Sequence, residues 1–211
     1  MRFAPWIGTL ATCFAVAPGS AADSPELDRQ VQAFLSAERG RWDYLNVPYR
    51  DGQILHNLVV KGGYKRILEI GTSTGHSTVW LAWAAAKTGG RVTTIEIDRG
   101  RHERALANFR RAGLAEYVDA RLGDAHELVK ALPGPWDFVF SDADKEWYLQ
   151  YFLDLEAKIA PGGCYTAHNV AHPYARQVTE FLDYVKKRPG FGLRFAEGAS
   201  SEGISISCRS R

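Results

Sequence analysis

The most informative stretch of this chain is Ile67-Leu-Glu-Ile-Gly-Thr-Ser-Thr-Gly-His-Ser-Thr78, which is followed further on by Thr94-Ile-Glu-Ile-Asp98. Its apolar residues predict a buried strand that leads into a turn, where Gly71 and Gly75 let a ligand approach the backbone before a helix begins. Glu96 ends the next apolar strand, where a carboxylate can accept hydrogen bonds from both hydroxyls of a ribose. The pattern therefore predicts a nucleoside-binding site.

The spacing of the two glycines indicates which nucleoside is bound. A dinucleotide fingerprint reads Gly-x-Gly-x-x-Gly, and its middle glycine lets a pyrophosphate lie against the backbone. The turn here is Gly71-x-x-x-Gly75, and its lack of a middle glycine argues against a nicotinamide-dependent oxidoreductase. S-adenosylmethionine carries no phosphate and suits this looser turn, which begins at Glu69. A turn whose glycines serve only packing is the alternative.

Length and composition suit one enzyme-sized domain. The chain has 211 residues, 45% of them hydrophobic, which is enough for one sizeable core. Its 26 basic residues are balanced by 24 acidic ones, for a formal charge of +2. This balance gives no indication of a nucleic-acid partner.

Residues 1–22 resemble a secretory signal peptide. Arg2 precedes an apolar run over Ile7–Ala17, and the small residues of Pro18-Gly-Ser-Ala-Ala22 suit a cleavage site. The run is far shorter than the roughly 20 residues of a membrane span, so we expect no stable membrane anchor. We expect a single domain over residues 23–211, periplasmic or secreted. If residues 1–22 are only a disordered start, the protein is cytoplasmic, where S-adenosylmethionine is made.

Strand and helix patterns alternate from Arg66 onward, after two helical segments. The first helix is predicted over Pro25–Gly40 with Ser24 as its N-cap, and the second over Gln53–Lys61, ended by glycines. This alternation predicts an α/β fold, with a parallel sheet and helices on both of its faces. The last two strands are joined by a short connection, so we expect them to form an antiparallel pair. The predicted strands are Arg66–Ile70, Arg91–Ile95, Tyr117–Leu122, Trp136–Ser141, Gly163–Ala167, Gly192–Glu197 and Gly203–Cys208.

The polar side chains best suited to chemistry follow the carboxyl ends of these strands, where parallel sheets bind ligands. The fourth strand ends in Asp142-Ala-Asp144-Lys145, which brings two carboxylates and an amine together. We expect one carboxylate to face the cofactor and the other to hold a hard cation, and a mere helix cap is the alternative for Asp144. Lys145 is the candidate base. Because lysine is normally protonated at neutral pH, this role requires a nearby cation or burial.

Five motifs carry a resemblance to a known family: Leu45-Asn46-Val47 with Gly52-Gln53, Leu68-Glu-Ile-Gly-Thr-Ser-Thr-Gly-His-Ser77, Ile95-Glu96-Ile97, Gly123-Asp124-Ala125 and Asp142-Ala-Asp144-Lys145. The chain resembles the cation-dependent O-methyltransferases typified by catechol O-methyltransferase and caffeoyl-coenzyme A O-methyltransferase, from about Leu45 to Cys208. The resemblance implies a Rossmann-like methyltransferase sheet of seven strands, mostly parallel with a C-terminal antiparallel hairpin.

The resemblance also implies a cofactor, an acceptor and a set of site residues. The cofactor is S-adenosylmethionine, and the acceptor is a hydroxyl of a small aromatic, catechol-like molecule. Lys145 matches the residue proposed to deprotonate that hydroxyl, and Asp142 matches a catalytic residue that is also the first metal ligand. The residues expected to bind the cofactor are Val47, Glu69, Gly71, Thr72, Ser73, Gly75, Ser77, Glu96, Asp124, Ala125, Asp142 and Asp144.

The chain departs from the family after the fifth strand, where members usually carry adjacent Asp and Asn and this chain has His168-Asn169. A metal site of Asp142, His168 and Asn169 has less negative charge and includes an imidazole. We therefore expect a divalent cation at this site. Magnesium, manganese and a transition metal are the candidates, and the imidazole favours a transition metal. In the alternative, His168 is a hydrogen-bonded rim residue and no metal binds.

Two cysteines, Cys164 and Cys208, lie beyond the predicted leader. In the family that the chain resembles, the last strand runs antiparallel beside the fifth, so Cys164 would face Cys208 and the two could pair. We favour two unpaired buried thiols, because cysteines on adjacent strands often have strained disulfide geometry.

Two points about function stay open on the sequence alone. A non-catalytic or metal-independent S-adenosylmethionine-binding protein of the same fold is the alternative to a methyl-transferring enzyme. A homodimer packed through the amphipathic helix Pro25–Gly40 is a further expectation.

Overall fold

The computed structural model describes residues 24–42, 45–171 and 176–211, so the predicted signal peptide lies outside the described residues. The strands are β1 (Arg66–Ile70), β2 (Arg91–Glu96), β3 (Val118–Leu122), β4 (Trp136–Ser141), β5 (Ile159–His168), β6 (Phe191–Phe195) and β7 (Ile204–Arg209). The helices are α1 (Pro25–Ala37), α2 (Tyr49–Gly62), α3 (His76–Thr88), α4 (Arg99–Arg111), α5 (Ala125–Ala131), α6 (Tyr148–Leu155) and α7 (Arg176–Lys187).

The strands form one seven-stranded sheet in the order β3-β2-β1-β4-β5-β7-β6. Strands β1 to β5 are parallel to one another, whereas β7 runs antiparallel to both of its neighbours, β5 and β6. The predicted Rossmann-like α/β sheet with its antiparallel C-terminal pair is confirmed. The chain changes direction across the sheet between β1 and β4, and in such sheets the carboxyl ends of those two strands border a ligand crevice.

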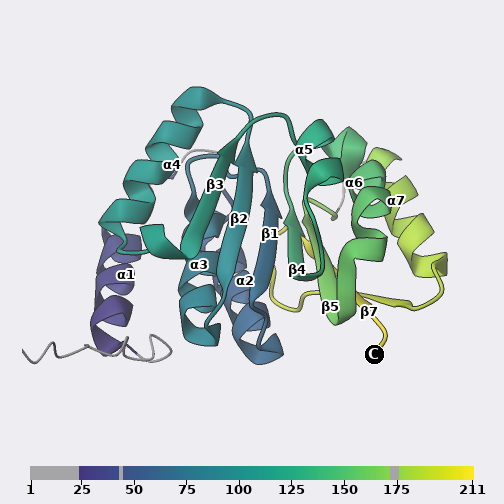
Figure 1. The fold of residues 1–211 in the computed structure, drawn as a ribbon, viewed down its shortest axis with the longest axis horizontal. Helices are drawn as coiled ribbons and strands as arrows, with labels where there is room; N and C mark the ends of the chain where they lie inside the picture. Colours follow the sequence, from purple (N-terminus) through teal and green to yellow (C-terminus); the bar gives the residue numbers. More distant parts are fainter. Residues whose placement is uncertain (1–23, 43–44, 172–175) are drawn as a thin grey trace, which may run out of the picture.

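Helices cover both faces of the sheet, and each face has its own apolar core. Successive side chains of β1 point to opposite faces. Ile67 therefore packs in the core that includes residues of α1, α2, α3 and α4, whereas Leu68 and Ile70 pack in the core that includes residues of α5, α6 and α7. In Figure 1, α1 and α4 lie at one side of the picture and α6 and α7 at the other. The strand that leads to the candidate site is thus buried on both faces.

The second helix is longer than predicted. It begins at Tyr49 rather than Gln53, after Pro48 in extended backbone, and it continues through Gly52. A Cβ on Gly52 would lie 2.1 Å from a ring carbon of Trp80. This glycine therefore permits close packing of α2 on α3 and does not break the helix.

The fifth strand also extends beyond its predicted bounds of Gly163–Ala167. It runs from Ile159 to His168, with a register shift opposite Trp136 and Phe138 on β4. The irregularity hid the first residues of the strand from a simple apolar pattern. At its other end, the longer strand carries His168 to the edge where the candidate site lies.

A disulfide joins β5 to β7. Cys164 and Cys208 are direct partners in the antiparallel register, and their sulfurs are bonded. The expectation of two unpaired thiols was wrong, because directly opposed residues on adjacent antiparallel strands point to the same face and lie close together. The bond ties the C-terminal hairpin to the parallel part of the sheet.

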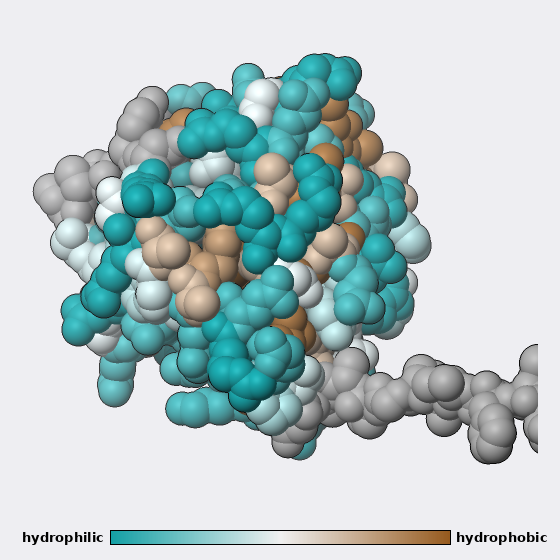
Figure 2. Space-filling model, turned by 90° about the vertical axis from the view of Figure 1, so that its left-hand side faces the viewer, coloured by the Kyte–Doolittle hydropathy of each residue, from teal (hydrophilic) through white to brown (hydrophobic). Residues whose placement is uncertain are grey.

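The surface of the described residues is largely hydrophilic on the face drawn in Figure 2, where hydrophobic side chains form only small, separate patches. The predicted homodimer stays a prediction. Among the described helices, none combines the length and apolar character needed to cross a membrane.

Candidate active site

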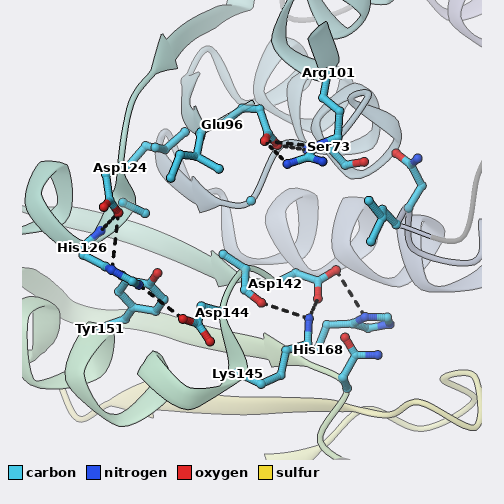
Figure 3. A pocket seen from close by; sticks show the side chains of 18 of the residues that line it. Ser73, Glu96, Arg101, Asp124, His126, Asp142, Asp144, Lys145, Tyr151 and His168 are labelled. Atoms are coloured by element: carbon cyan, nitrogen blue, oxygen red, sulfur yellow. Dashed lines mark hydrogen bonds and ion pairs between the residues drawn. The ribbon is translucent and has the colours of Figure 1, made fainter. Parts of the chain in front are cut away.

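A pocket of about 520 Å³ opens at the carboxyl ends of the parallel strands. Its size lies within the range of roughly 300 to 1,000 Å³ that is typical of small-molecule sites. Figure 3 shows several of its charged side chains pointing toward one another across the pocket. The lining residues are Leu45, Asn46, Gly71, Ser73, Ile95, Glu96, Ile97, Arg101, Gly123, Asp124, Ala125, His126, Asp142, Ala143, Asp144, Lys145, Tyr151, His168, Asn169 and Glu202.

The two glycines of the loop after β1 have different roles. Gly71 lines the pocket with φ of 100°, and a Cβ there would lie 2.7 Å from the carbonyl oxygen of Asp142. Gly75 has φ of 96°, but a Cβ there would meet the ring of Phe109 at 2.6 Å. Gly71 therefore lets the backbone form the pocket wall. Gly75 serves helix packing, which agrees with the alternative of glycines that serve packing.

Glu96 lies at one end of the pocket with its side chain held on both oxygens. Its Oε2 accepts a hydrogen bond from the Ser73 backbone N–H at 2.8 Å. Its Oε1 accepts from the Asp98 N–H at 2.9 Å and from the Arg101 guanidinium at 2.8 Å. Only 5% of Glu96 is exposed, so its carboxylate is fixed before any ligand arrives. Sequence reasoning missed Arg101, although it follows Asp98 in the first turn of α4.

Five predicted cofactor residues do not line the pocket in the described structure: Val47, Glu69, Thr72, Gly75 and Ser77. Glu69 is completely buried beneath it, where Thr78 and Thr94 donate hydrogen bonds to its carboxyl. Burial raises the pKa of Glu69 to about 7. Val47 is buried as well, and its carbonyl oxygen lies 2.8 Å from Nδ1 of His76. Their role in cofactor binding stays a prediction.

The opposite side of the cofactor end is formed by two helix-capping carboxylates. Asp124 accepts from the His126 N–H at 2.9 Å, and Asp144 accepts from the Glu146 N–H at 3.0 Å. The His126 ring lies 3.5 Å from a carboxylate oxygen of each aspartate and stacks on Trp147 with 3.7 Å between ring centroids. Asp144 is thus both a helix cap and a pocket residue. His126 was missed because it belongs to no recognised motif.

Asp142 and Lys145 meet at the other end of the pocket. The Lys145 ammonium donates to Asp142 Oδ1 at 2.8 Å and to the Ala143 carbonyl oxygen at 3.2 Å. The side chain of Asp142 is 13% exposed and that of Lys145 is 31% exposed. The structure therefore brings the two predicted catalytic residues together, with the amine reaching the pocket.

His168 lies against the second oxygen of Asp142, as Figure 3 shows. Its Nδ1 is 3.3 Å from Asp142 Oδ2 and 3.6 Å from Glu202 Oε2, and its Nε2 is 2.9 Å from Asp51 Oδ2. Asp51 is completely buried and also accepts from the backbone N–H of Ser200 at 2.8 Å. Burial by itself lowers the pKa of the His168 imidazole, but the carboxylates of Asp142 and Asp51 outweigh it and raise that pKa to about 9.

Comparison with known proteins identifies the family. A profile described as O-methyltransferase matches residues 19–188. The chain belongs to this O-methyltransferase family. A catechol O-methyltransferase of Niastella koreensis is 38% identical over 130 residues, which cover 60% of this chain and 58% of that protein. A catechol O-methyltransferase of Mycobacterium tuberculosis is 39% identical over 137 residues, covering 63% and 60%. The chain thus aligns with about three fifths of the length of these curated relatives.

The fold of this family member is also that of a solved relative. The O-methyltransferase TomG from Streptomyces achromogenes, solved in complex with S-adenosylmethionine, matches with a TM-score of 0.74 and 26% identity. The match covers 90% of this chain and 92% of TomG. The likeness therefore extends over nearly the whole chain.

The residues of this family member do not fit the divalent cation predicted at Asp142, His168 and Asn169. Both ring nitrogens of His168 face carboxylate oxygens, Nε2 at 2.9 Å from Asp51 and Nδ1 at 3.3 Å from Asp142. These surroundings favour a ring protonated on both nitrogens, and such a ring has no lone pair for a metal. Among the residues that the structure describes, no group of three or more His, Cys, Asp or Glu side chains is arranged to hold a metal ion. The alternative of a hydrogen-bonded His168 agrees better with this geometry.

Three residues of this cluster were missed by sequence reasoning: Asp51, Ser200 and Glu202. His168 lies 117 residues from Asp51 in the sequence, and Ser200 lies 149 residues from it. The one available signal was the position of Asp51, directly before the Gly52-Gln53 motif.

Proposed function

We propose that this protein binds S-adenosylmethionine in the pocket and transfers its methyl group to a hydroxyl of a small aromatic, catechol-like acceptor. The observation that carries the proposal is the arrangement of one pocket, with Glu96 at one end and the Lys145–Asp142 pair at the other. The relatives named catechol O-methyltransferases and the S-adenosylmethionine complex of TomG support it.

The cofactor end suits a nucleoside. Glu96 offers a fixed carboxylate for ribose hydroxyls, and Gly71 leaves the wall open where a side chain would collide with Asp142. On the far side, Ala125, His126 and Asp144 line the part of the pocket that we assign to the base. The absence of a middle glycine in the loop, together with this placement, favours S-adenosylmethionine over a dinucleotide.

S-adenosylmethionine supplies an electrophilic methyl group on a positively charged sulfur. The protein holds the acceptor oxygen in line with that carbon, so orientation supplies much of the rate. As the oxygen–carbon bond forms and the carbon–sulfur bond breaks, the hydroxyl proton passes to Lys145 while the Lys145 ammonium hands one of its own protons to Asp142 Oδ1. S-adenosylhomocysteine leaves as the neutral thioether, and the proton ends on Asp142. Asp142 keeps the amine of Lys145 in place through the 2.8 Å contact. Lys145 lies in the short segment between β4 and α6, and its amine reaches the pocket from there.

The acidity of the acceptor follows from this arrangement. No metal is invoked here to lower the pKa of the hydroxyl. A phenol has an intrinsic pKa of about 10, far below that of an aliphatic alcohol, so a phenolic hydroxyl gives up its proton more readily. We therefore propose an aromatic hydroxyl as the acceptor.

The disulfide between Cys164 and Cys208 bears on where the protein works. Structural disulfides persist in oxidising compartments. We propose that the protein is exported, in accord with the leader-like residues 1–22. Fractionation of the native cells followed by thiol counting on the denatured, unreduced protein tests this: protein with blocked thiols outside the cytoplasm supports export, and protein found only in the cytoplasm contradicts it.

Calorimetry and mass spectrometry test the proposed function. We expect S-adenosylmethionine to bind with a measurable heat and NAD to give none. A panel of catechols and phenols incubated with the labelled methyl donor should yield a methyl ether, detected by mass spectrometry. Binding of NAD alone would overturn the methyltransferase proposal. Binding of S-adenosylmethionine without transfer to any hydroxyl acceptor would favour the non-catalytic alternative.

A further inference from the structure

The charges around His168 form a cluster that the proposed reaction leaves unexplained. Three carboxylates, those of Asp51, Asp142 and Glu202, lie within 3.6 Å of its ring nitrogens. The imidazole itself is almost completely buried, with 1% exposure. The three carboxylates come from α2, from the residue after β4 and from the segment before β7. Such a concentration of negative charge in a buried site needs a cation.

We infer that the His168 imidazolium is a built-in cation that takes the place of a divalent metal, holding Asp142 in position so that methyl transfer proceeds without any metal. This inference rests on the proposed function and names a positioning residue for it. His168 stands where the family usually carries an aspartate. An anionic ligand has thus been replaced by a group that can carry the positive charge itself.

The two oxygens of Asp142 show how the positioning works. Oδ1 accepts from the Lys145 ammonium at 2.8 Å, and Oδ2 lies 3.3 Å from His168 Nδ1. A cation on each side leaves the carboxylate one orientation. If His168 were neutral with its proton on Nε2, its Nδ1 lone pair would face two carboxylates and push Asp142 away from Lys145.

Asp51 holds the imidazole from the other side. Its Oδ2 lies 2.9 Å from His168 Nε2 and accepts from the Ser200 hydroxyl at 2.5 Å, while its Oδ1 accepts from the Ser200 N–H. The Tyr148 hydroxyl donates to the His168 backbone carbonyl at 3.0 Å. Asp51 on α2 therefore fixes the ring and Tyr148 on α6 fixes the backbone that carries it, so the imidazole stays directed at Asp142.

A metal-binding histidine would share part of this arrangement, because such residues usually donate their second ring nitrogen to a carboxylate. The two cases differ at Nδ1, which carries a proton in the imidazolium and a metal ion in the other case. Metal content and the protonation of this nitrogen therefore discriminate between them.

The first experiment measures metal binding and activity on chelator-treated protein. We expect wild type to bind no Mn²⁺ by titration calorimetry or electron paramagnetic resonance, and to methylate a catechol at the same rate with and without chelator. The His168→Asp variant restores an anionic ligand beside Asp142 and Asn169, so it should gain Mn²⁺ binding and lose its activity in chelator. Mn²⁺ binding by wild type with chelator-sensitive activity would overturn the inference.

The second experiment uses the wild-type protein and does not depend on enzyme activity. Nitrogen-15 NMR of the His168 ring in wild type at neutral pH should show both nitrogens protonated. A ring with one protonated nitrogen would overturn the inference. Because this readout is independent of catalysis, a failure to methylate any acceptor would count against the proposed function alone.

A neutral variant gives the size of the effect. His168→Gln keeps hydrogen-bonding capacity without the charge, and we expect kcat to fall about tenfold to hundredfold while the KM for S-adenosylmethionine stays the same. The matched control is His102→Gln on α4, outside the pocket, which should leave kcat unchanged. Equal losses in both variants, or an unchanged kcat in His168→Gln, would contradict the inference.

Discussion

The two ends of the pocket each centre on a carboxylate, but the carboxylates are held in different ways. Glu96 is held by two backbone N–H groups and by Arg101, which lies near the surface. Asp142 is held between two cationic side chains, Lys145 and His168. Backbone N–H groups hold a carboxylate in place without bringing a side chain that could take part in proton transfer. Side-chain cations fix it and bring proton-carrying groups to the pocket, so the comparison assigns binding to the first end and chemistry to the second.

The largest expected effect is at the chemical end. Lys145→Ala removes the amine that meets the acceptor hydroxyl, and we expect kcat to fall by about 10² to 10⁴, the usual contribution of a positioned proton-transfer group. Binding of S-adenosylmethionine should be unchanged in calorimetry, because Glu96 and its partners are untouched. Lys61→Ala, at an exposed position on α2, is the matched control. A loss of cofactor binding equal to the loss of rate would show that the two ends are not separable.

The next effect concerns Glu69, which lies on β1 beneath the pocket, between β2 and β4. Burial raises its pKa from 4.5 to about 7. Between these values the folded chain keeps the proton that the unfolded chain has released, so this group lowers the free energy of unfolding as the pH rises from 4.5 to 7. The total is about 3 kcal/mol, and it changes no further above pH 7.

Urea unfolding of wild type and Glu69→Gln at pH 5 and pH 8 tests this. The amide does not titrate, so wild type should lose about 3 kcal/mol more than the variant between the two pH values. Equal losses would mean that the Glu69 carboxyl is ionised throughout. Activity is a second readout: if Glu69 only supports the floor, the variant should keep its affinity for S-adenosylmethionine.

The same contrast explains what the sequence could predict. The strand over Arg66–Ile70 and the turn after it were predicted with correct bounds, because apolar periodicity and glycine conformation are local properties. Glu96 was found for the same reason, since it ends an apolar strand that follows the Gly71 turn. Local patterns thus predicted the strand, the Gly71 turn and Glu96, but not which neighbouring residues line the pocket.

The cluster at the chemical end could be predicted only in part. Asp142 and Lys145 are neighbours in the sequence, but the contact between His168 and Asp51 joins residues 117 positions apart. One chain carries no signal for such a pairing. His168 was therefore interpreted as a metal ligand from its position alone, whereas the three carboxylates around it determine its charge.

A smaller effect is expected at the binding end. Glu96→Gln replaces the carboxylate by an amide of the same shape, and hydrogen bonds to charged groups contribute about 1.5 to 3 kcal/mol. The Kd for S-adenosylmethionine should therefore rise about tenfold to hundredfold, with kcat at saturating cofactor nearly unchanged. Calorimetry measures the first and steady-state kinetics the second. The exposed Glu103→Gln on α4 is the control, and an unchanged Kd in Glu96→Gln would remove the ribose assignment.

The smallest effect concerns Arg101, and its sign separates two roles. Oε1 of Glu96 already accepts hydrogen bonds from the Asp98 N–H and from two nitrogens of Arg101. These are three donors for an oxygen that has two lone pairs. A ribose with two hydroxyls needs an acceptor there, so Arg101 has to withdraw when the cofactor binds. Arg101→Met should then tighten S-adenosylmethionine binding by up to about fivefold, the size of a partly exposed ion pair, and weaken its dependence on salt. Arg99→Met at the start of α4 is the control. Weaker binding in Arg101→Met would show instead that Arg101 fixes the carboxylate for the ribose, in which case both ends of the pocket would rely on a side-chain cation.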